Sequence, residues 1–287
     1  MKDHPRYYAY FTLCRLHQPI GIFLLLWPTL WALWVAGLGV VPLRIILLFI
    51  LGVILTRTLG CVINDIVDRN LDGHVRRTLH RPLVIGTVSV KEAILMVVAL
   101  TALAFVVVCQ FNRLTIGLAS IALVFMTIYP LTKRYLGWPQ LFLGLVFGGW
   151  PILIAFAAET GRIPPISGLL FLAAYSWCIA YDTIYAMMDR QDDQHVGIRS
   201  SALALGQYEV IFINTIETVF VFLLSVIGFY LKVHFIYYVM LLCVIGLFIY
   251  QHHLIKSRKP AACFKAFLNN AWIGGLIFLG FWGGLPT

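Results

Sequence analysis

The sequence predicts an all-α protein that crosses a membrane many times. Of its 287 residues, 61% are hydrophobic and only 11% are charged, and the mean hydropathy is +0.91. A soluble domain of this length could not bury so much apolar surface. Apolar stretches of spanning length recur along the whole chain, separated by short charged segments. We therefore expect a single transmembrane domain over residues 1–287, built as a bundle of about nine helices in two related halves.

Nine stretches are long enough to span a bilayer as helices. They lie at about 19–39, 42–63, 88–109, 114–131, 136–158, 165–188, 208–231, 233–251 and 266–284. Gly and Pro interrupt several of them, which membrane helices tolerate.

The distribution of basic residues predicts the orientation. With the N-terminus in the cytoplasm, fifteen Lys and Arg between the apolar stretches fall on the cytoplasmic side and four on the opposite side. Because short cytoplasmic loops carry the excess of basic residues, the C-terminus is expected on the opposite side. A net charge of +9 could indicate nucleic-acid binding. The basic residues lie in short segments between apolar stretches, however, so membrane topology explains the charge better.

Two acidic segments share a pattern. Asp68-Arg69-x-x-Asp72-x-His74-Val75 is echoed by Asp189-Arg190-x-x-Asp193-x-His195-Val196, which suggests the two related halves. On an α-helix each segment places its polar side chains within an arc of about 100°. The residues on these two faces are Asn64, Asp65, Asp68 and Asp72 in the first segment, and Asp182, Tyr185, Asp189, Asp192 and Asp193 in the second.

Both segments end predicted spans on the cytoplasmic side, so they can face one cavity. A carboxylate at membrane depth is costly and marks a functional site by default. Clustered carboxylates need a cation between them, and Mg²⁺ is bound by one or two carboxylates together with substrate phosphates. The neighbouring bases favour an anionic ligand. This pattern indicates Mg²⁺ and a pyrophosphate, with the charge of a leaving group stabilised as it departs.

Simpler interpretations apply to some of these residues. A single Asp at a helix end is more often a solvated charge, although two echoed clusters are not. Arg15, Lys133 and Arg134 could serve only as topology anchors. A cation-coupled transporter is the main alternative of another class, but transport sites usually lie near the midplane at broken helices. Both clusters lie at helix ends, which favours an enzyme.

These motifs resemble those of the UbiA-type intramembrane prenyltransferases. The signature NDxxDxxxD corresponds to Asn64-Asp65-x-x-Asp68-x-x-x-Asp72, and YDTxYAMxDRxDDxxxGI(K/R)S runs from Tyr181 to Ser200. The stretches LLLWPTLWAL and Tyr129-Pro130-x-x-Lys133-Arg134 match as well, so the resemblance covers nearly the whole chain. Arg199 and Ser201 stand where the pattern has Lys and Thr.

The resemblance implies a fold and a reaction. The fold is a nine-helix bundle in the bacterial inner membrane, with a cytoplasm-facing cavity that opens laterally to lipid. The reaction is the Mg²⁺-dependent transfer of a polyprenyl group from polyprenyl diphosphate to the ring of 4-hydroxybenzoate, ortho to the hydroxyl, in ubiquinone biosynthesis. The expected partners are these two substrates and membrane lipid, without nucleic acid. Homogentisate, dihydroxynaphthoate and haem stay open as alternative acceptors.

The resemblance also implies roles for the site residues. The expected metal ligands are Asn64, Asp65, Asp68, Asp72, Asp189, Asp192 and Asp193. Asp68, Asp72, Asp189 and Asp193 are the expected catalytic carboxylates, with Asp182 and Tyr185 orienting the phenol or assisting its deprotonation. Arg15 is the expected partner of the substrate carboxylate, and Lys133 and Arg134 would steady the diphosphate. Further expected substrate contacts are Arg77, Arg81, Tyr129 and Arg199. The sequence does not predict which residues line the prenyl tunnel.

Overall fold

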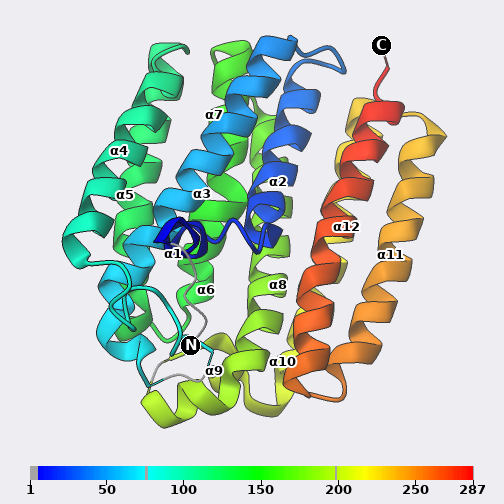
Figure 1. The fold of residues 1–287 in the computed structure, drawn as a ribbon. Coiled ribbons are helices and arrows are strands. Elements are labelled where there is room, and N and C mark those ends of the chain that lie inside the picture. The colour runs from blue at the N-terminus through cyan, green and yellow to red at the C-terminus, as the bar shows by residue number, and fades with distance from the viewer. Residues whose placement is uncertain (1–5, 75–76, 198, 287) are drawn as a thin grey trace.

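Long helices make up the described part of the chain (Figure 1). The computed structural model describes residues 6–74, 77–197 and 199–286, with the side chains of Lys133, Arg134 and Val196 outside the described part. Within these residues there is no strand, and eight helices are long and apolar enough to cross a membrane. With the shorter apolar helix α2 (Ile20–Ala36), this agrees with the prediction of about nine spans.

The remaining helices are α3 (Leu43–Asp72), α4 (Val90–Val108), α5 (Arg113–Tyr135), α6 (Pro139–Leu143), the π-helix η1 (Gly144–Gly149), α7 (Trp150–Thr160), α8 (Pro165–Val196), α9 (Ser201–Leu205), the 3₁₀-helix η2 (Gly206–Tyr208), α10 (Glu209–Leu231), α11 (Phe235–Ile255) and α12 (Pro260–Gly284). The long helices among them overlap the predicted stretches, although α3 and α8 run beyond their predicted ends and the short helix α9 lies outside any of them.

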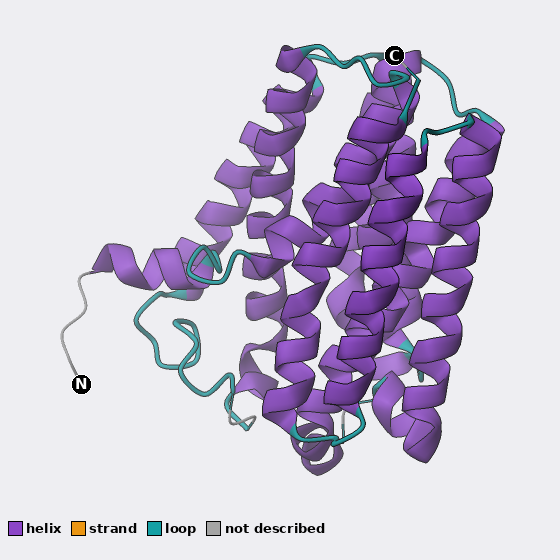
Figure 2. Cartoon of the chain, turned by 90° about the vertical axis from the view of Figure 1, so that its right-hand side faces the viewer, coloured by secondary structure: helices purple, strands orange, loops and turns teal. Residues whose placement is uncertain are grey.

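The helix α1 (Arg6–Leu13) was not predicted, because eight residues are too few to give a periodic signal. It lies across the long helices rather than along them (Figure 2). Its Leu13 is fully buried in a cluster with Val62 of α3 and Ala93 of α4. Tyr10 Oη donates to Glu92 Oε1 at 2.8 Å, and Glu92 also completes the cap of α4. Helix α1 is therefore fixed to the start of α4.

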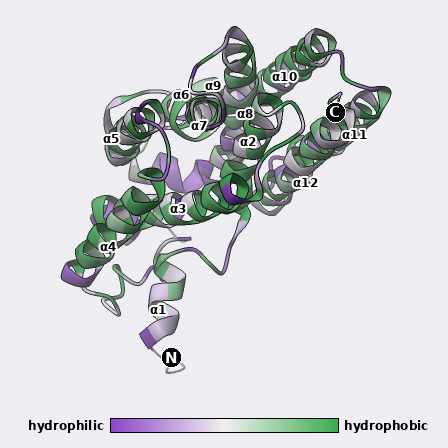
Figure 3. Cartoon of the chain, turned by 90° about the horizontal axis from the view of Figure 1, so that it is seen from above, coloured by the Kyte–Doolittle hydropathy of each residue, from purple (hydrophilic) through white to green (hydrophobic). Residues whose placement is uncertain are grey.

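Helix α8 lies at the centre of the packing and contacts α10, α12 and η1. The largest buried side chains around it are aromatic: the rings of Trp31 and Trp177 are 5.1 Å apart, and those of Trp177 and Phe220 stack at 6.0 Å. Viewed from above, the ribbons of α4, α5, α11 and α12 are largely hydrophobic (Figure 3). This distribution suits a protein whose outer surface faces lipid.

The two acidic segments lie on extensions of the longest helices. Helix α3 has 30 residues and α8 has 32, whereas about 20 residues suffice to cross a bilayer. Neither helix contains a breaker in its last turns. Helix α3 stops at Gly73, and α8 stops at Gly197, whose φ of 75° is the left-handed conformation that glycine adopts readily. Both segments therefore reach the same end of the bundle, opposite the end of α12 (Figure 1).

Candidate active site

An acidic cavity lies between the C-terminal ends of α3 and α8. Its lining includes five of the seven expected metal ligands, together with the expected catalytic Asp182: Asn64, Asp68 and Asp72 from α3, with Asp182, Asp189 and Asp193 from α8. Asp68 and Asp72 are each only 7% exposed. Asp65 faces a neighbouring cavity instead, and Asp192 is not among the side chains that line the acidic cavity. The structure thus brings the two sequence motifs together.

Arginines contact several of these carboxylates. Arg77 donates from Nε to Asp189 Oδ1 at 3.0 Å and from Nη2 to Asp189 Oδ2 at 2.7 Å. Arg81 pairs with both Asp65 and Asp72, and Thr78 Oγ1 donates to the Asp72 carbonyl at 2.7 Å. Residues 77–81 of the connection between α3 and α4 are therefore held against the acidic cavity by their side chains.

The donor set suits a hard divalent cation that is shared with a phosphate. All predicted ligands are carboxylate or amide oxygens, the atoms that Mg²⁺ prefers. Among the described residues, no three His, Cys, Asp or Glu side chains converge as a ready-made metal cage. Mg²⁺ does not require one, because it is usually held by one or two carboxylates and the oxygens of a bound phosphate. The residues fit a metal that arrives with a diphosphate.

A central cavity adjoins the acidic one and contains a cation that the sequence analysis missed. Arg57 lines it from the interior of α3. Its Nη1 donates to Cys61 Sγ at 3.0 Å, and within the described residues it has no ion-pair partner. A Cβ on Gly21 would overlap the Arg57 guanidinium, so glycine at this position lets the guanidinium keep its observed place. The available signal was a lone arginine inside an apolar span, where a charge is costly.

Arg15 lines the same central cavity but is already engaged. Its Nη2 donates to both oxygens of Asp65, at 2.7 and 2.9 Å, and its Nη1 donates to the Thr12 carbonyl at 3.1 Å. Its backbone φ of 56° is unusual for a residue other than glycine.

A polar vestibule continues the central cavity outward. The two share Arg15, Gln18, Arg77, Arg81, Tyr185 and Phe264, and the vestibule adds the exposed His17 and His80. Burial and the nearby Arg15 lower the pKa of His17, so this imidazole is neutral at pH 7. The basic character of the vestibule therefore comes from its arginines.

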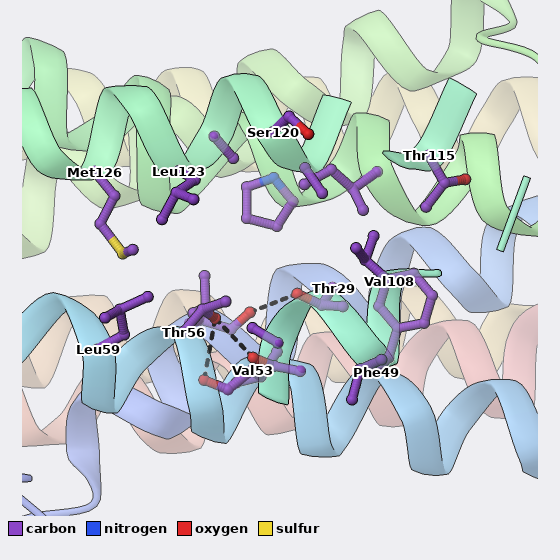
Figure 4. Close-up of a pocket in the computed structure, with 18 of the residues that line it drawn as sticks. Thr29, Phe49, Val53, Thr56, Leu59, Val108, Thr115, Ser120, Leu123 and Met126 are labelled. Carbon is purple, nitrogen blue, oxygen red and sulfur yellow. Dashed lines mark hydrogen bonds between the residues drawn. The ribbon is translucent and has the colours of Figure 1, made fainter. Parts of the chain in front are cut away.

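An apolar groove leaves the central cavity in another direction, between α3, α4, α5 and α7 (Figure 4). The groove and the central cavity share Leu25, Met126 and Phe147. Several of its hydroxyl groups bond within their own helices: Thr29 donates to the Leu25 carbonyl at 2.7 Å and Thr56 to the Gly52 carbonyl at 2.8 Å. The wall of the groove is therefore apolar to a ligand.

The other predicted substrate contacts are distributed as follows. Tyr129 and Tyr185 line both the acidic and the central cavity, and Arg199 lines the acidic cavity while it donates to the Tyr135 carbonyl at 3.2 Å. The side chains of Lys133 and Arg134 lie outside the described part of the structure. Ser200 was not predicted; its buried Oγ lines the acidic cavity and has no hydrogen-bond partner among the described residues.

Comparison with known proteins agrees with this geometry. Residues 25–280 match the UbiA prenyltransferase family. A Coxiella burnetii (strain CbuK_Q154) protein named 4-hydroxybenzoate octaprenyltransferase is 47% identical over 271 residues, which cover 94% of each chain. A Photobacterium profundum protein of the same name is 48% identical, over 95% of this chain and 94% of its own.

Solved structures share the fold. A UbiA homolog from Aeropyrum pernix K1, solved in its apo form, superimposes with a TM-score of 0.78 at 24% identity, covering 91% of this chain and 96% of that one. A UbiA homolog from Archaeoglobus fulgidus bound to GPP and Mg²⁺ gives a TM-score of 0.74 at 17% identity, covering 95% and 99%. From the shared fold and the sequence match together, the chain belongs to the UbiA prenyltransferase family.

Proposed function

We propose that this protein transfers a polyprenyl group from polyprenyl diphosphate to the ring of 4-hydroxybenzoate, ortho to the hydroxyl, as a step of ubiquinone biosynthesis. The observation that carries the proposal is the continuity of three differently lined spaces: the central cavity shares lining residues with the apolar groove on one side and with the acidic cavity on the other. A molecule with an apolar tail and a diphosphate head fits the groove and the acidic cavity. The similarity to proteins named 4-hydroxybenzoate octaprenyltransferase supports the choice of acceptor.

The diphosphate would bind in the acidic cavity. Asn64, Asp68, Asp72, Asp189 and Asp193 would hold Mg²⁺, which would neutralise the charge that develops on the departing diphosphate. Asp65 and Asp192 lie in the same motifs and would be outer ligands. The Archaeoglobus fulgidus homolog bound to GPP and Mg²⁺ supports a divalent metal and a prenyl diphosphate as the ligands. Arg77, Arg81, Arg199 and the unsatisfied Ser200 hydroxyl would donate hydrogen bonds to the phosphate oxygens, together with Lys133 and Arg134.

The aromatic acid would bind in the central cavity with its carboxylate on Arg57. A half-buried cation without an ion-pair partner among the described residues favours an anionic group, whereas Arg15 is already bound to Asp65. Arg15 would then support the vestibule through which the acid passes. Tyr129, Asp182 and Tyr185 line the boundary with the acidic cavity, where they would orient the phenol ring toward the prenyl carbon.

The chemistry follows from this placement. The bond between the first prenyl carbon and the diphosphate oxygen breaks, and its electron pair leaves with the diphosphate. A ring carbon ortho to the hydroxyl attacks the resulting allylic cation, and loss of the ring proton restores aromaticity. Asp182, at the boundary of the two cavities, would assist removal of this proton. The chain's main contribution is to hold the two substrates in contact and to exclude water.

We also propose that the protein lies in the bacterial inner membrane with the acidic cavity facing the cytoplasm. The bacterial relatives and the excess of Lys and Arg on that side support this placement. Both 4-hydroxybenzoate and Mg²⁺ would then reach the site from the cytoplasm.

The reaction is tested in membranes that contain the protein, supplied with labelled 4-hydroxybenzoate, a polyprenyl diphosphate and Mg²⁺. A lipid-extractable labelled product is expected, and a chelator should abolish it. If no product forms from folded protein, homogentisate and dihydroxynaphthoate are tried next, because either acid would also fit the Arg57 cation. If no acceptor reacts, the proposal is wrong and cation flux is measured.

Substitution of one carboxylate from each helix tests whether the two motifs form one site. Asp68→Asn and Asp189→Asn should each lower kcat by about 100-fold or more, since each removes charge stabilisation in the transition state. The amount of folded protein in the membrane is measured alongside. Full activity in either variant would contradict a shared site.

Blocking the groove tests the path of the prenyl tail. Gly52 lines the groove twelve residues before Asn64, about 18 Å along α3 at 1.5 Å per residue. Gly52→Phe should reduce transfer of an octaprenyl group by about tenfold or more, and affect a geranyl group much less. Gly246→Phe, on α11 where a Cβ meets nothing within 4 Å, is the control. Equal losses with both tail lengths would place the tail elsewhere.

A further inference from the structure

Two arginines of the connection between α3 and α4 contact carboxylates that the proposed function gives to the metal. Arg77 makes a bidentate hydrogen bond to Asp189: Nε and Nη2 each donate to one carboxylate oxygen. Arg81 contacts Asp72 and, at 3.0 Å, Asp65 Oδ1. A guanidinium in this geometry uses the same lone pairs that a metal ion would use. Arginine and metal therefore compete for Asp189 and for Asp72.

Both arginines can serve another ligand without leaving the site. Arg77 and Arg81 line the acidic cavity, the central cavity and the vestibule. The segment between them is anchored, because the buried Thr78 hydroxyl donates to the Asp72 carbonyl and Arg81 N donates to the Thr78 carbonyl at 3.0 Å. The Arg77 guanidinium also lies 5.2 Å from the centre of the Tyr185 ring. A change of partner needs only a rotation of the side chain within the cavity.

We infer that Arg77 and Arg81 are counterions that exchange the carboxylates for the diphosphate when the prenyl donor binds. Before the diphosphate arrives they neutralise Asp189 and Asp72. When it arrives they donate to its oxygens instead, which frees both carboxylates for the metal. The inference rests on the proposed function and deepens it, because it makes binding of the metal and binding of the diphosphate depend on each other.

The consequence is a coupling that can be measured at equilibrium. Without diphosphate, the metal must displace an arginine and binds weakly. With diphosphate, it meets free carboxylates as well as phosphate oxygens. By linkage, the factor by which diphosphate tightens metal binding equals the factor by which the metal tightens diphosphate binding. Loss of an exchanging arginine removes its part of that factor.

The test uses the full-length protein in lipid nanodiscs, with Mn²⁺ as the probe. Free Mn²⁺ is measured by electron paramagnetic resonance, first with Mn²⁺ alone and then with inorganic diphosphate. Arg77→Gln should bind Mn²⁺ alone about three- to tenfold more tightly than the unsubstituted protein, because Asp189 no longer has a competing cation. The tightening of Mn²⁺ binding by diphosphate should fall by a similar factor.

Two further variants separate this exchange from general damage to the site. Arg77→Lys keeps the charge but loses the two-pronged contact, so its Mn²⁺ affinity should lie between that of the unsubstituted protein and that of Arg77→Gln. Arg6→Gln removes the pair of Arg6 with Glu92 outside the cavities and should change nothing. Arg81→Gln repeats the test at Asp72, with thermal unfolding as the check that each variant is folded.

The outcomes are distinct. If Arg77→Gln and Arg81→Gln bind Mn²⁺ alone no more tightly than the unsubstituted protein, and diphosphate tightens binding by the same factor in all, the exchange does not occur. The proposed function would survive that result. If the unsubstituted protein fails to bind Mn²⁺ even with diphosphate, the proposed function and the exchange both fall.

Discussion

Arg57 lies in the interior of helix α3, away from the acidic ends, and its surroundings leave it one sulfur contact and no ion pair among the described residues. A Cβ added at Gly21 would overlap the guanidinium, which shows how closely α2 approaches it. A charge in an apolar bundle is retained only where it has a partner or a ligand. The open side of Arg57 faces the central cavity.

Substitution of Arg57 should therefore affect one substrate more than the other. Arg57→Gln should raise the KM for 4-hydroxybenzoate by about tenfold or more, since a charge-assisted hydrogen bond is worth about 1.5–3 kcal/mol. The KM for the polyprenyl diphosphate should change little. Steady-state kinetics with each substrate varied in turn measures both values. Arg44→Gln, which removes only an exposed contact with Gln110, is the matched control. A uniform change in both KM values would remove Arg57 from acceptor binding.

At this scale the sequence predicted the carboxylates but not their partners. Asn64, Asp68, Asp72, Asp189 and Asp193 were found because helical periodicity places them on two faces, and the structure joins those faces in one cavity. Arg57 carries no periodic signal and stands alone in an apolar stretch. The pairing of Arg77 with Asp189 joins residues 112 positions apart, and no local pattern encodes such a contact.

The π-helical segment η1 lies between helix α8 and the apolar groove, because it packs on the first and lines the second. A π-turn widens a helix locally and is frequent at functional sites. Here it is lined inward by Gly144, Gly148 and Gly149, where an added Cβ would lie 3.1 Å or less from atoms of α8. The same six residues carry Val146 and Phe147 toward the groove. One short segment thus packs tightly on α8 through its glycines and lines the groove with its larger side chains.

Gly148→Val should test this close contact. A Cβ at Gly148 would lie 2.6 Å from the Ala174 carbonyl and 2.8 Å from Cys178 Cβ, so α8 must move. The cost of such overpacking is about 1–3 kcal/mol, and the melting temperature in detergent should fall. Gly117→Val on α5, where nothing lies within 4 Å of the added Cβ, is the control. A melting temperature equal to that of the control would show that η1 can shift freely.

Long elements were predictable and short ones were not. The nine apolar stretches match the observed spans because apolar composition over about 20 residues is a strong signal. The predicted stretch 136–158 hides three pieces, α6, η1 and α7, since their differences lie in hydrogen-bond registers that hydropathy does not report. Helix α1 escaped prediction because its structure depends on contacts with Val62 and Ala93, which are distant in the sequence.

Across the whole molecule, a chain of polar side chains connects the last three helices to α8. Gln251 Nε2 of α11 donates to Glu217 Oε1 of α10 at 2.9 Å. Asn270 Nδ2 of α12 donates to Gln251 Oε1 at 3.3 Å, and Trp177 Nε1 of α8 donates to Asn270 Oδ1 at 2.9 Å. The Trp177 ring packs edge-on against Tyr181, which lines the central cavity. This network ties the outer helices to the wall of the site.

Removal of its centre should loosen the bundle. Gln251→Leu leaves the Glu217 carboxyl and the Asn270 amide without that partner, at a cost of about 1–3 kcal/mol, and thermal unfolding should occur at a lower temperature. Thr218→Val on α10 removes an exposed hydroxyl that bonds only to its own helix at the Asn214 carbonyl, and it should have little effect. If the two variants unfold at the same temperature, the network contributes nothing to stability.

The groove and the vestibule open onto different surroundings. Phe105, 58% exposed on the outer face of α4, lines the groove, whereas exposed polar side chains such as Gln18 and His80 line the vestibule. Under the proposed function, the effective concentrations of the two substrates are measured on different scales. For the prenyl donor it is the mole fraction in the bilayer, and for the aromatic acid it is the molarity in bulk water. Addition of empty lipid would dilute the first without changing the second, so the rate depends on the ratio of membrane to enzyme as well as on the dissolved acid.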